Sequence, residues 1–523
     1  MKILIITGQQ SYNTIEKVVI PIKKHTIDII KAPISISAFL TEMSVSNILE
    51  KVKTSKYDLV LLPGFIQWDS SELEERYSIK IRKGPEFASD LPYTLNNLEK
   101  LELSNIIPAN ILLEISGENE FKKIVREQLN SAVNDLGIHT YYINQEKSNI
   151  MIGRNLPPPI IAEIVNCPDK SNENILKKVK HYINSGADII DIGCISNKPK
   201  PERIKKIIKL IRENYDVLIS IDSMIPEEIN AAVEENVDLI LSLDLGNYKE
   251  LMDIPKNIPI VILPTNIKEA YFPKDAETRV QNLFKLTREL ISKGYTKLIA
   301  DPLLETPINP GITNSLEAYF LYKKKVAENK YKEYELPLFF GISNVVELMD
   351  IDSVGINGLL ASISIELDMG ILFTVEHSAK LMGGVRELKE SVKLNYIAKY
   401  KNTPPINQGI KVFKAKGKIN QEMAEINEEK IIEVDVNAHD YIPDESGYFR
   451  IYVNHYLKKI YVLFYSIDDL LIHTFIGDNA EALSKKIIQY NLTKDIYHLN
   501  YLGRELKKAE MHLIFGKPYI QDE

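Results

Sequence analysis

Short apolar runs that end in an aspartate recur through the middle of the chain. One run leads to Asp191, the next to Asp222, and a third, much later, to Asp301. Stretches with the helical spacing of apolar residues separate these runs, so strand and helix alternate. A single aspartate after a strand is usually a turn residue or a helix cap. Three of them among alternating strands and helices predict a (β/α)8 barrel, whose chemistry lies at the carboxyl ends of its strands.

The number of predicted strands supports the barrel. The first strand covers residues 160–164, after the proline-rich segment 155–159, which marks a domain boundary. The later strands end near seven positions: Ile192, Ile221, Leu243, Leu263, Ala300, Phe340 and Val375. A second proline-containing boundary lies at 402–405. We therefore predict an α/β protein with a central (β/α)8 TIM barrel over residues 156–400.

The two flanking segments predict smaller domains. In residues 1–152, buried-strand patterns at 2–7 and 57–64 accompany a helical stretch at 44–53, which is typical of a flavodoxin-like open α/β sheet. Residues 408–523 predict a separate α+β domain. Its strands are expected at 433–436, 448–453 and 460–465, and its helices at 479–490 and 502–513.

Composition narrows the class of protein. The chain has 523 residues and a net charge of −8, so no overall positive charge favours nucleic acid. Its two cysteines, Cys167 and Cys194, lack CxxC spacing, so we predict small core residues in a reducing cytoplasm and no metal site. The longest apolar stretch, 354–375, is interrupted by Glu366 and Asp368. We expect no membrane span.

Four local motifs in the barrel region resemble those of a known family. They are Val-Asn-Cys-Pro-Asp at 165–169, Gly-Ala-Asp-Ile-Ile-Asp-Ile-Gly at 186–193, Ile-Ser-Ile-Asp-Ser at 219–223 and Ala-Asp-Pro at 300–302. Their order and spacing are similar to those of the pterin-binding family that contains dihydropteroate synthase and the methyltetrahydrofolate methyltransferases. The resemblance extends over the whole predicted barrel.

This resemblance implies a pterin site lined by acids. A pterin presents two neighbouring N–H donors, and a carboxylate accepts both as a bidentate pair. By resemblance, Asp222 and Asp301 hold the ring, with Asp301 on this donor edge. Asn166, Asp191 and Asp244 are the other candidate pterin-binding residues. Asp191 is expected to order the loop at the rim of the pocket.

The fourth strand departs from the family pattern. The asparagine that the family usually has there is not obviously in place in the run Leu-Ser-Leu-Asp-Leu-Gly-Asn at 241–247. Asn247 is a candidate substitute for it.

The seventh and eighth strands distinguish two branches of the family. The run Gly-Ile-Ser-Asn at 341–344 is similar to the methyltransferase motif whose asparagine hydrogen-bonds near pterin N5. Asn344 is therefore the candidate catalytic residue, with a loop residue satisfied by backbone as the alternative. At the eighth strand, Thr-Val-Glu at 374–376 stands where dihydropteroate synthase has Arg-x-His. Classical dihydropteroate synthesis is not expected, because the acidic Glu376 would oppose departure of a diphosphate.

The resemblance implies a methyltransferase-type enzyme that uses a reduced pterin of the tetrahydromethanopterin or tetrahydrofolate type. The methyl acceptor would be a cobamide carried by a partner corrinoid protein, since the barrel itself offers no such group. Two alternatives remain open: a condensing enzyme that joins a pterin to an arylamine, and a non-catalytic pterin-binding or assembly subunit. Barrels of this family often form homodimers, which the sequence does not test.

The C-terminal segment supports the same resemblance. Residues 444–449 and 501–510 are similar to an uncharacterised domain that follows such barrels in archaeal proteins. The whole chain resembles the archaeal dihydropteroate synthase-related proteins. His473 and His512 are expected to be structural, because neither has a partner at metal-ligand spacing. Contact with a ligand is one interpretation of His498 and a nearby charged cluster, but mutual surface ion pairs on one helix are the preferred one. The cluster is Arg504, Glu505, Lys508 and Glu510.

Overall fold

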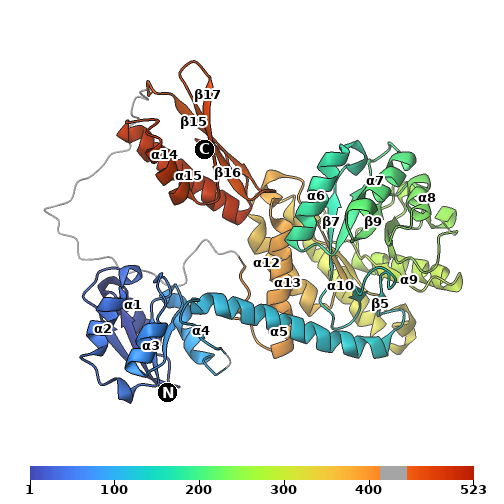
Figure 1. Cartoon of the computed structure of the whole chain (residues 1–523). Coiled ribbons are helices and arrows are strands. Elements are labelled where there is room, and N and C mark those ends of the chain that lie inside the picture. Colours follow the sequence, from blue (N-terminus) through green and yellow to red (C-terminus); the bar gives the residue numbers. More distant parts are fainter. Residues whose placement is uncertain (100, 252, 413–443, 523) are drawn as a thin grey trace. The chain divides into compact units, whose positions relative to one another are not determined.

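The computed structural model describes residues 1–99, 101–251, 253–412 and 444–522, and the chain divides into two compact units (Figure 1). One unit contains Met1–Ile124 and the described residues 400–412. The other contains Val125–Lys399 and the described residues 444–522. The helix α5 (Ala109–Ala132) includes the point at which the first unit ends and the second begins.

The first unit is built on a parallel four-stranded sheet with the order β2-β1-β3-β4. The strands are β1 (Lys2–Thr7), β2 (Thr26–Lys31), β3 (Leu59–Leu62) and β4 (Ile81–Lys83). The helices are α1 (Gln9–Val19), α2 (Glu42–Leu49), α3 (Ser71–Tyr77) and α4 (Leu91–Asn96). The sheet is open and parallel, with β1 and β3 in its centre.

Both faces of this sheet are covered, which explains why its two central strands carry continuous apolar runs, residues 3–6 in β1 and Leu59–Leu62 in β3. Ile3 and Ile5 of β1 lie in one core cluster with α1 and α4, whereas Leu4 and Ile6 lie in another with α2 and α3. Side chains alternate between the two faces of a strand, so a strand buried on both faces reads as a continuous apolar run.

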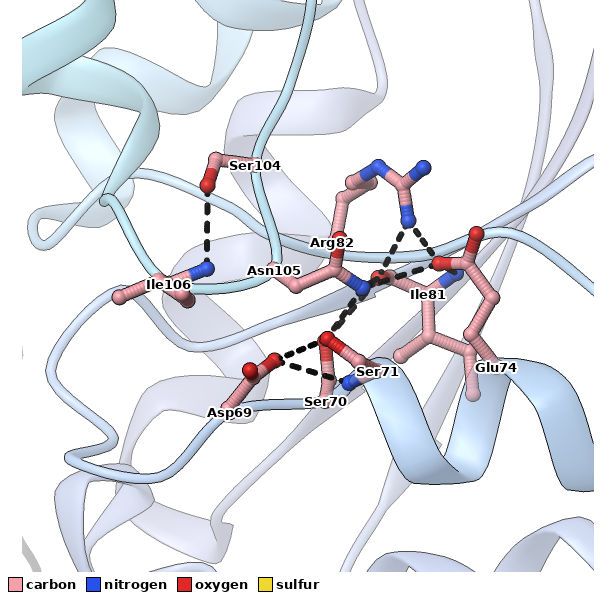
Figure 2. A network of polar contacts seen from close by, with 9 residues as sticks. All are labelled: Asp69, Ser70, Ser71, Glu74, Ile81, Arg82, Ser104, Asn105 and Ile106. Carbon is pink, nitrogen blue, oxygen red and sulfur yellow. Dashed lines mark hydrogen bonds and ion pairs between the residues drawn. The ribbon is translucent and has the colours of Figure 1, made fainter.

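A polar network ties the end of β4 to α3 (Figure 2). The Asn105 amide lies within 3.0 Å of both the Ile81 carbonyl and the Glu74 carboxylate, and 3.3 Å from the Ser70 hydroxyl. Arg82 forms an ion pair with the same Glu74. These contacts satisfy polar groups inside the unit and position the chain that follows β4.

The second unit contains the predicted barrel. Its eight parallel strands have the order β12-β11-β10-β9-β8-β7-β14-β13, and a bridge between Ala300 and Leu338 joins the two ends of this row. The strands are β7 (Ile160–Ile164), β8 (Ile189–Gly193), β9 (Leu218–Asp222), β10 (Leu239–Leu243), β11 (Ile260–Ile262), β12 (Leu298–Ala300), β13 (Phe339–Gly341) and β14 (Ile371–Val375). All eight predicted strands are confirmed.

Helices surround this barrel (Figure 1). They are α6 (Asn172–Ser185), α7 (Pro201–Asn214), α8 (Pro226–Glu234), α9 (Ala276–Ser292), α10 (Ile312–Val326), α11 (Ser343–Val346), α12 (Ser353–Glu366) and α13 (Gly384–Lys401). The end of one of these helices, α6, explains the glycine at position 186 of the sequence motif. Gly186 ends α6 in the left-handed conformation (φ 96°), and a Cβ there would lie 2.8 Å from the Lys389 side chain.

A short hairpin covers one end of the barrel core. Its strands are β5 (Tyr141–Tyr142) and β6 (Met151–Ile152). Tyr141 and Ile152 belong to the same core cluster as the inward-facing Ile161, Ile189 and Leu218, which begin or lie near the beginning of their strands. The Tyr141 hydroxyl donates to the Leu298 carbonyl at 2.8 Å. The hairpin therefore seals the amino-terminal end, opposite to the end where the acids lie.

The described C-terminal residues form an antiparallel sheet with two helices packed on it. The strands are β15 (Tyr448–Asn454), β16 (Lys459–Tyr465) and β17 (Leu471–Gly477), and the helices are α14 (Ala480–Gln489) and α15 (Ile496–Phe515). The α+β prediction is confirmed, but β17 was not predicted. The strand expected at 433–436 lies outside the described residues. Within the described residues, no helix combines the length and the apolar character needed to cross a membrane.

Candidate active site

The acids that end the barrel strands face its interior. Two residues before Asp191 is Ile189, and two residues before Asp301 is Ile299; both isoleucines belong to the barrel core. Side chains on a strand repeat their direction every second residue, so the aspartates lie on the same inner face, one layer nearer the carboxyl end. The strand pattern thus places an acidic layer above an apolar one.

Glu163, Asp191 and Asp222 form a carboxylate trio in this layer. One carboxylate oxygen from each lies within 4.8 Å of the others. The register explains the meeting, because Glu163 pairs with Asp191 across β7 and β8, and Gly193 pairs with Asp222 across β8 and β9. Gly193 makes room for the trio, since a Cβ at this position would lie 2.1 Å from Glu163 Oε1.

The trio cannot carry three full negative charges without cost. Burial raises the pKa of Asp191 well above its ordinary value, and the Asp222 and Glu163 charges raise it further. Burial, with the charges of Asp222 and Glu347, raises the pKa of Glu163 to about 8. Burial also raises the pKa of Asp222, against the hydroxyl of Ser242. At neutral pH at least one of the three is therefore expected to hold a proton.

Asp191 retains an unused acceptor. Its Oδ1 accepts a hydrogen bond of 2.6 Å from the Ser220 hydroxyl, whereas its buried Oδ2 has no partner among the described residues. Oxygen ligands of this kind suit Mg²⁺ or Ca²⁺, and the same oxygens accept N–H donors from an organic ligand. The sequence predicted no metal site, and the trio is the group of described residues that has the geometry to hold one.

Asp301 is held in a second acidic position at the end of β12. Its Oδ1 accepts from the Leu303 amide at 2.8 Å and lies 3.0 Å from the Tyr319 hydroxyl. Burial raises the pKa of Asp301 to about 7, although the Leu303 amide and the Tyr319 hydroxyl oppose that rise. The carboxyl is therefore poised to change its charge near neutral pH.

Two side chains hold the loop that follows Asp301. The buried Arg279 pairs with Glu305 and donates to the Leu303 carbonyl at 3.0 Å. The Asn344 amide donates to the Leu304 carbonyl at 2.9 Å. Asn344 lies in the short helix α11 that follows β13 and is exposed, so its side chain is accessible at this end of the barrel. The structure thus brings the candidate Asn344 and the loop of Asp301 together.

Other predicted site residues have different surroundings. Asp244 is fully buried, and its carboxylate accepts from the amides of Gly246, Asn247 and Ile267 and from the Thr265 hydroxyl. Its four hydrogen bonds all hold the loops at the ends of β10 and β11. Asn247 is also buried.

The Asn247 side chain accepts from the Asp244 amide and lies within reach of the Ser242 and Met224 carbonyls. Asn166 is exposed after β7, with a left-handed backbone (φ 49°). The structure therefore gathers Asp191 and Asp222 in one cluster and places Asn166, Asp244 and Asn247 in the surrounding loops.

The end of β14 carries a buried ion pair. Glu376 Oε2 lies 2.7 Å from His181 Nε2 on α6 and 3.8 Å from Lys178 Nζ. Burial opposes the charge of Glu376, but His181 and Lys178 outweigh it and lower the pKa of the carboxyl. A charged, buried acid therefore occupies the end of β14.

Several contributing residues were missed by sequence reasoning. Glu163 was available from the alternation of β7, because it lies two residues after the core residue Ile161. Ser220, which donates to Asp191, lies two residues after the core residue Leu218 on β9 and follows from the same alternation. Ser242, which donates to Asp222, does not, because it lies next to the inward-facing Leu241 on β10, where the ladder is irregular and its own φ is 78°. Tyr319 lies on α10, far from Asp301 in sequence, and no local signal points to it.

Comparison with known proteins identifies the family. Residues 166–355 match the family described as pterin binding enzyme, and residues 443–522 match the family described as PterinBD-DUF4346. An uncharacterised protein of Methanocaldococcus jannaschii is 34% identical over 536 aligned positions, which cover all of this chain and 98% of that protein.

Shorter similarities are found with dihydropteroate synthases, of which the chain matches less than half the length in sequence. Dihydropteroate synthase of Streptococcus pyogenes is 32% identical over 111 residues, which cover 19% of this chain and 42% of that enzyme. The enzyme of Clostridium beijerinckii is 33% identical over 102 residues, covering 17% and 37%. A crystal structure of Yersinia pestis dihydropteroate synthase aligns over 49% of this chain and 98% of that chain, at 17% identity and a TM-score of 0.37.

Three findings indicate the same family. They are the full-length similarity, the two matched domains, and the barrel with its acidic layer. The chain belongs to the family of archaeal dihydropteroate synthase-related proteins, in which a pterin-binding barrel is joined to a characteristic C-terminal domain.

Proposed function

We propose that this protein binds a reduced pterin, of the tetrahydromethanopterin or tetrahydrofolate type, between Asp222 and Asp301. The observation that carries the proposal is the pair of inward-facing acids at the ends of β9 and β12, in a barrel of the pterin-binding family. Asp301 accepts the paired N–H donors of the ring, and Asp222 accepts on another edge. Both carboxyls favour an N–H donor because burial deprives them of water.

The same acidic layer supports a methyltransferase-type reaction. A methyl group on N5 of a reduced pterin leaves readily only when N5 is protonated, so that the departing ring is a neutral amine. Glu163 has a pKa of about 8 and lies beside Asp222, so it can hold a proton for N5 at neutral pH. The N5–methyl bond breaks as the acceptor bonds to the methyl carbon, and the N5 electron pair stays with the ring nitrogen.

Asn344 and the methyl acceptor complete this proposal. The exposed Asn344 can exchange its bond with the Leu304 carbonyl for one near N5 as charge develops there. The acceptor must be a strong nucleophile brought by another molecule, and a cobamide on a partner corrinoid protein fits this requirement. Asp244 orders the loops around the ring. Asp191, which was expected to order the rim loop, is instead buried within β8 in the carboxylate trio, where its free Oδ2 can accept from a ligand.

Local similarity to dihydropteroate synthases favours a second candidate, condensation of a pterin with an arylamine. Loss of diphosphate in that reaction requires cations near the leaving oxygens. Glu376, charged and buried at the end of β14, opposes such a leaving group. Methyl transfer is therefore the first candidate.

The decisive experiment is calorimetric titration of the wild-type protein and the Asp301→Asn variant with methylated and unmethylated tetrahydrofolate and tetrahydromethanopterin. Micromolar binding that the variant loses would support the ring position. Methyl transfer to a free cobamide would then support the first reaction, and product formation from an arylamine the second. The absence of binding to every reduced pterin would refute the proposal.

A further inference from the structure

A large cavity runs from the carboxyl ends of the barrel strands to the C-terminal domain. Its volume is about 1120 Å³, and its walls include Glu163 at the end of β7, Val375 at the end of β14, and α6. The remaining wall is the turn between β15 and β16, residues 454–458, with the last turn of α15. Because Glu163 also belongs to the carboxylate trio, the cavity continues directly from the acidic layer.

Specific contacts hold the C-terminal wall of the cavity. The Tyr456 ring packs edge-on against the His181 ring, with centroids 5.6 Å apart. Arg386 donates to the Ile514 carbonyl at 3.2 Å, and Lys517 pairs with Glu387 at 3.1 Å. The C-terminal domain thus forms part of the cavity wall through polar and aromatic contacts.

Basic side chains outnumber acidic ones in the cavity wall. Six basic residues line it, against the three carboxyls of Glu163, Glu376 and Asp478. The basic residues are Lys170, Lys177, Lys178, Lys180, Arg386 and Lys458. Lys178 lies beside Glu376, Lys177 pairs with Glu173, and Asp478 pairs with Lys459. The other four basic residues of the wall form no ion pair among the described residues, and this excess positive charge favours an anion.

A half-buried histidine supplies an independent indication. His455 lines the same cavity, and its buried Nε2 has no hydrogen-bond partner among the described residues. Buried polar atoms normally have a partner, and each one without a partner requires an explanation. Burial lowers the pKa of His455, and an anionic oxygen beside the ring would oppose that shift and accept a hydrogen bond from Nε2–H.

We propose that this cavity binds the anionic, carboxylate- or phosphate-bearing extension of the ligand whose ring lies in the barrel. The proposal rests on the proposed pterin site and names a further part of its substrate. The ring lies in the acidic layer, the extension leaves past Glu163, and its negative groups lie between α6 and the turn at 454–458. The C-terminal domain then acts as a specificity element for the tail of the ligand.

The test compares two reduced pterins by titration at low salt. Tetrahydrofolate carries a carboxylate extension, whereas 6-methyltetrahydropterin carries none. The variant Lys170→Gln/Lys458→Gln removes two cavity charges, and Lys206→Gln/Lys285→Gln removes two exposed charges from α7 and α9 as a matched control. Inorganic pyrophosphate serves as a probe of phosphate binding without a pterin.

We expect the cavity variant to weaken tetrahydrofolate binding about tenfold and to leave 6-methyltetrahydropterin binding within about twofold. The control variant should change neither. Equal affinity of the wild type and the cavity variant for tetrahydrofolate would overturn the inference while leaving the pterin site intact. If no pterin binds, the proposed function fails. In that case the binding of pyrophosphate tests the cavity by itself. Saturable pyrophosphate binding that is lost only in the cavity variant would support an anion site, and no pyrophosphate binding would overturn the inference.

Discussion

The Nε2 atom of His181 lies 2.7 Å from Oε2 of Glu376, and this pair joins helix α6 to the end of strand β14. The carboxylate side chain is 1% exposed, so it keeps its charge only because His181 and Lys178 lie beside it. The contact fixes a charged acid at the carboxyl end of the barrel strands. A single ion pair thus bears on both the stability and the chemistry of the site.

Removal of the imidazole tests this pair. We expect His181→Phe to lower the free energy of unfolding by about 1–3 kcal/mol, because Glu376 would remain buried without its partner. Adding Glu376→Gln to the variant should recover part of that loss, as thermal denaturation can measure. The lowered pKa of Glu376 stabilises the fold above the ordinary carboxyl range, and this stability is lost as pH falls through the lowered pKa. If the effects of the two substitutions on the free energy of unfolding were simply additive, a direct coupling of His181 with Glu376 would be contradicted.

Asp301 should make the stability of the ligand-free protein depend on pH in the opposite sense. Its pKa is raised to about 7, so the folded state holds the proton more tightly than the unfolded state. Stability should therefore decrease as pH rises from about 4 to 7. At pH 8, Asp301→Asn should be more stable than the wild type by about 1–4 kcal/mol, with little gain at pH 4. Denaturant titrations at the two pH values measure this, and an equal effect at both would contradict it.

The same carboxyl should control ligand affinity. A charged Asp301 accepts the paired N–H donors of a pterin, so affinity should fall as pH drops below about 7. Asp301→Asn should weaken binding by at least tenfold, because its side-chain amide presents a donor where an acceptor is needed. Titration of both proteins between pH 5.5 and 8.5 provides the comparison. An unchanged affinity in the variant would place the ring elsewhere.

Glu163 should carry a proton at neutral pH. Infrared difference spectra of wild type and Glu163→Gln should contain a carboxylic acid band that disappears above about pH 8 and is absent from the variant. Methyl transfer should fall over the same pH range, and the variant should lose about 10²–10⁴-fold in rate while keeping most of its pterin affinity. A variant that loses affinity and rate equally would indicate a binding role instead.

Asp244 should prove structural. Its carboxylate accepts four hydrogen bonds from the loops that follow β10 and β11, so Asp244→Ala would leave four donors without a partner. We expect a loss of about 3 kcal/mol or more in the free energy of unfolding. Hydrogen exchange should increase at Gly246 and Ile267 but not at Leu303, next to Asp301. A selective loss of pterin affinity with unchanged stability would assign it to the ligand instead.

Much of the fold was accessible to sequence reasoning because the buried strands of the barrel are apolar and end in polar loop residues. Asp222 is the last residue of β9, Asp301 directly follows β12, and Asp191 lies two residues before the end of β8. The strand β17 was missed because its apolar residues come in adjacent pairs, 471–472 and 475–476, and do not alternate with polar ones. The short β4 was missed for lack of length, with three residues.

The site was harder to predict from the sequence than the fold, because its decisive contacts join residues far apart in the chain. Sequence identified Asp222 and Asp301 but not Tyr319, whose hydroxyl contacts Asp301 from a helix. Nor does sequence distinguish a carboxylate that faces the interior from one that caps a loop. Asp222 and Asp244 both follow apolar runs. Asp222 nevertheless lies in the carboxylate trio, whereas the carboxylate of Asp244 accepts hydrogen bonds from backbone amides of nearby loops.

The hairpin at 141–152 has a consequence for how such barrels are inherited. It precedes the first barrel strand in the chain, but its Tyr141 and Ile152 complete the apolar layer that Ile161, Ile189 and Leu218 begin. A gene fragment that encoded the eight strands and their helices alone would leave this layer open to water. Recombination that moves the barrel between proteins must therefore also move the hairpin at 141–152, or supply another segment that covers this apolar layer. The evolutionary unit is larger than the barrel.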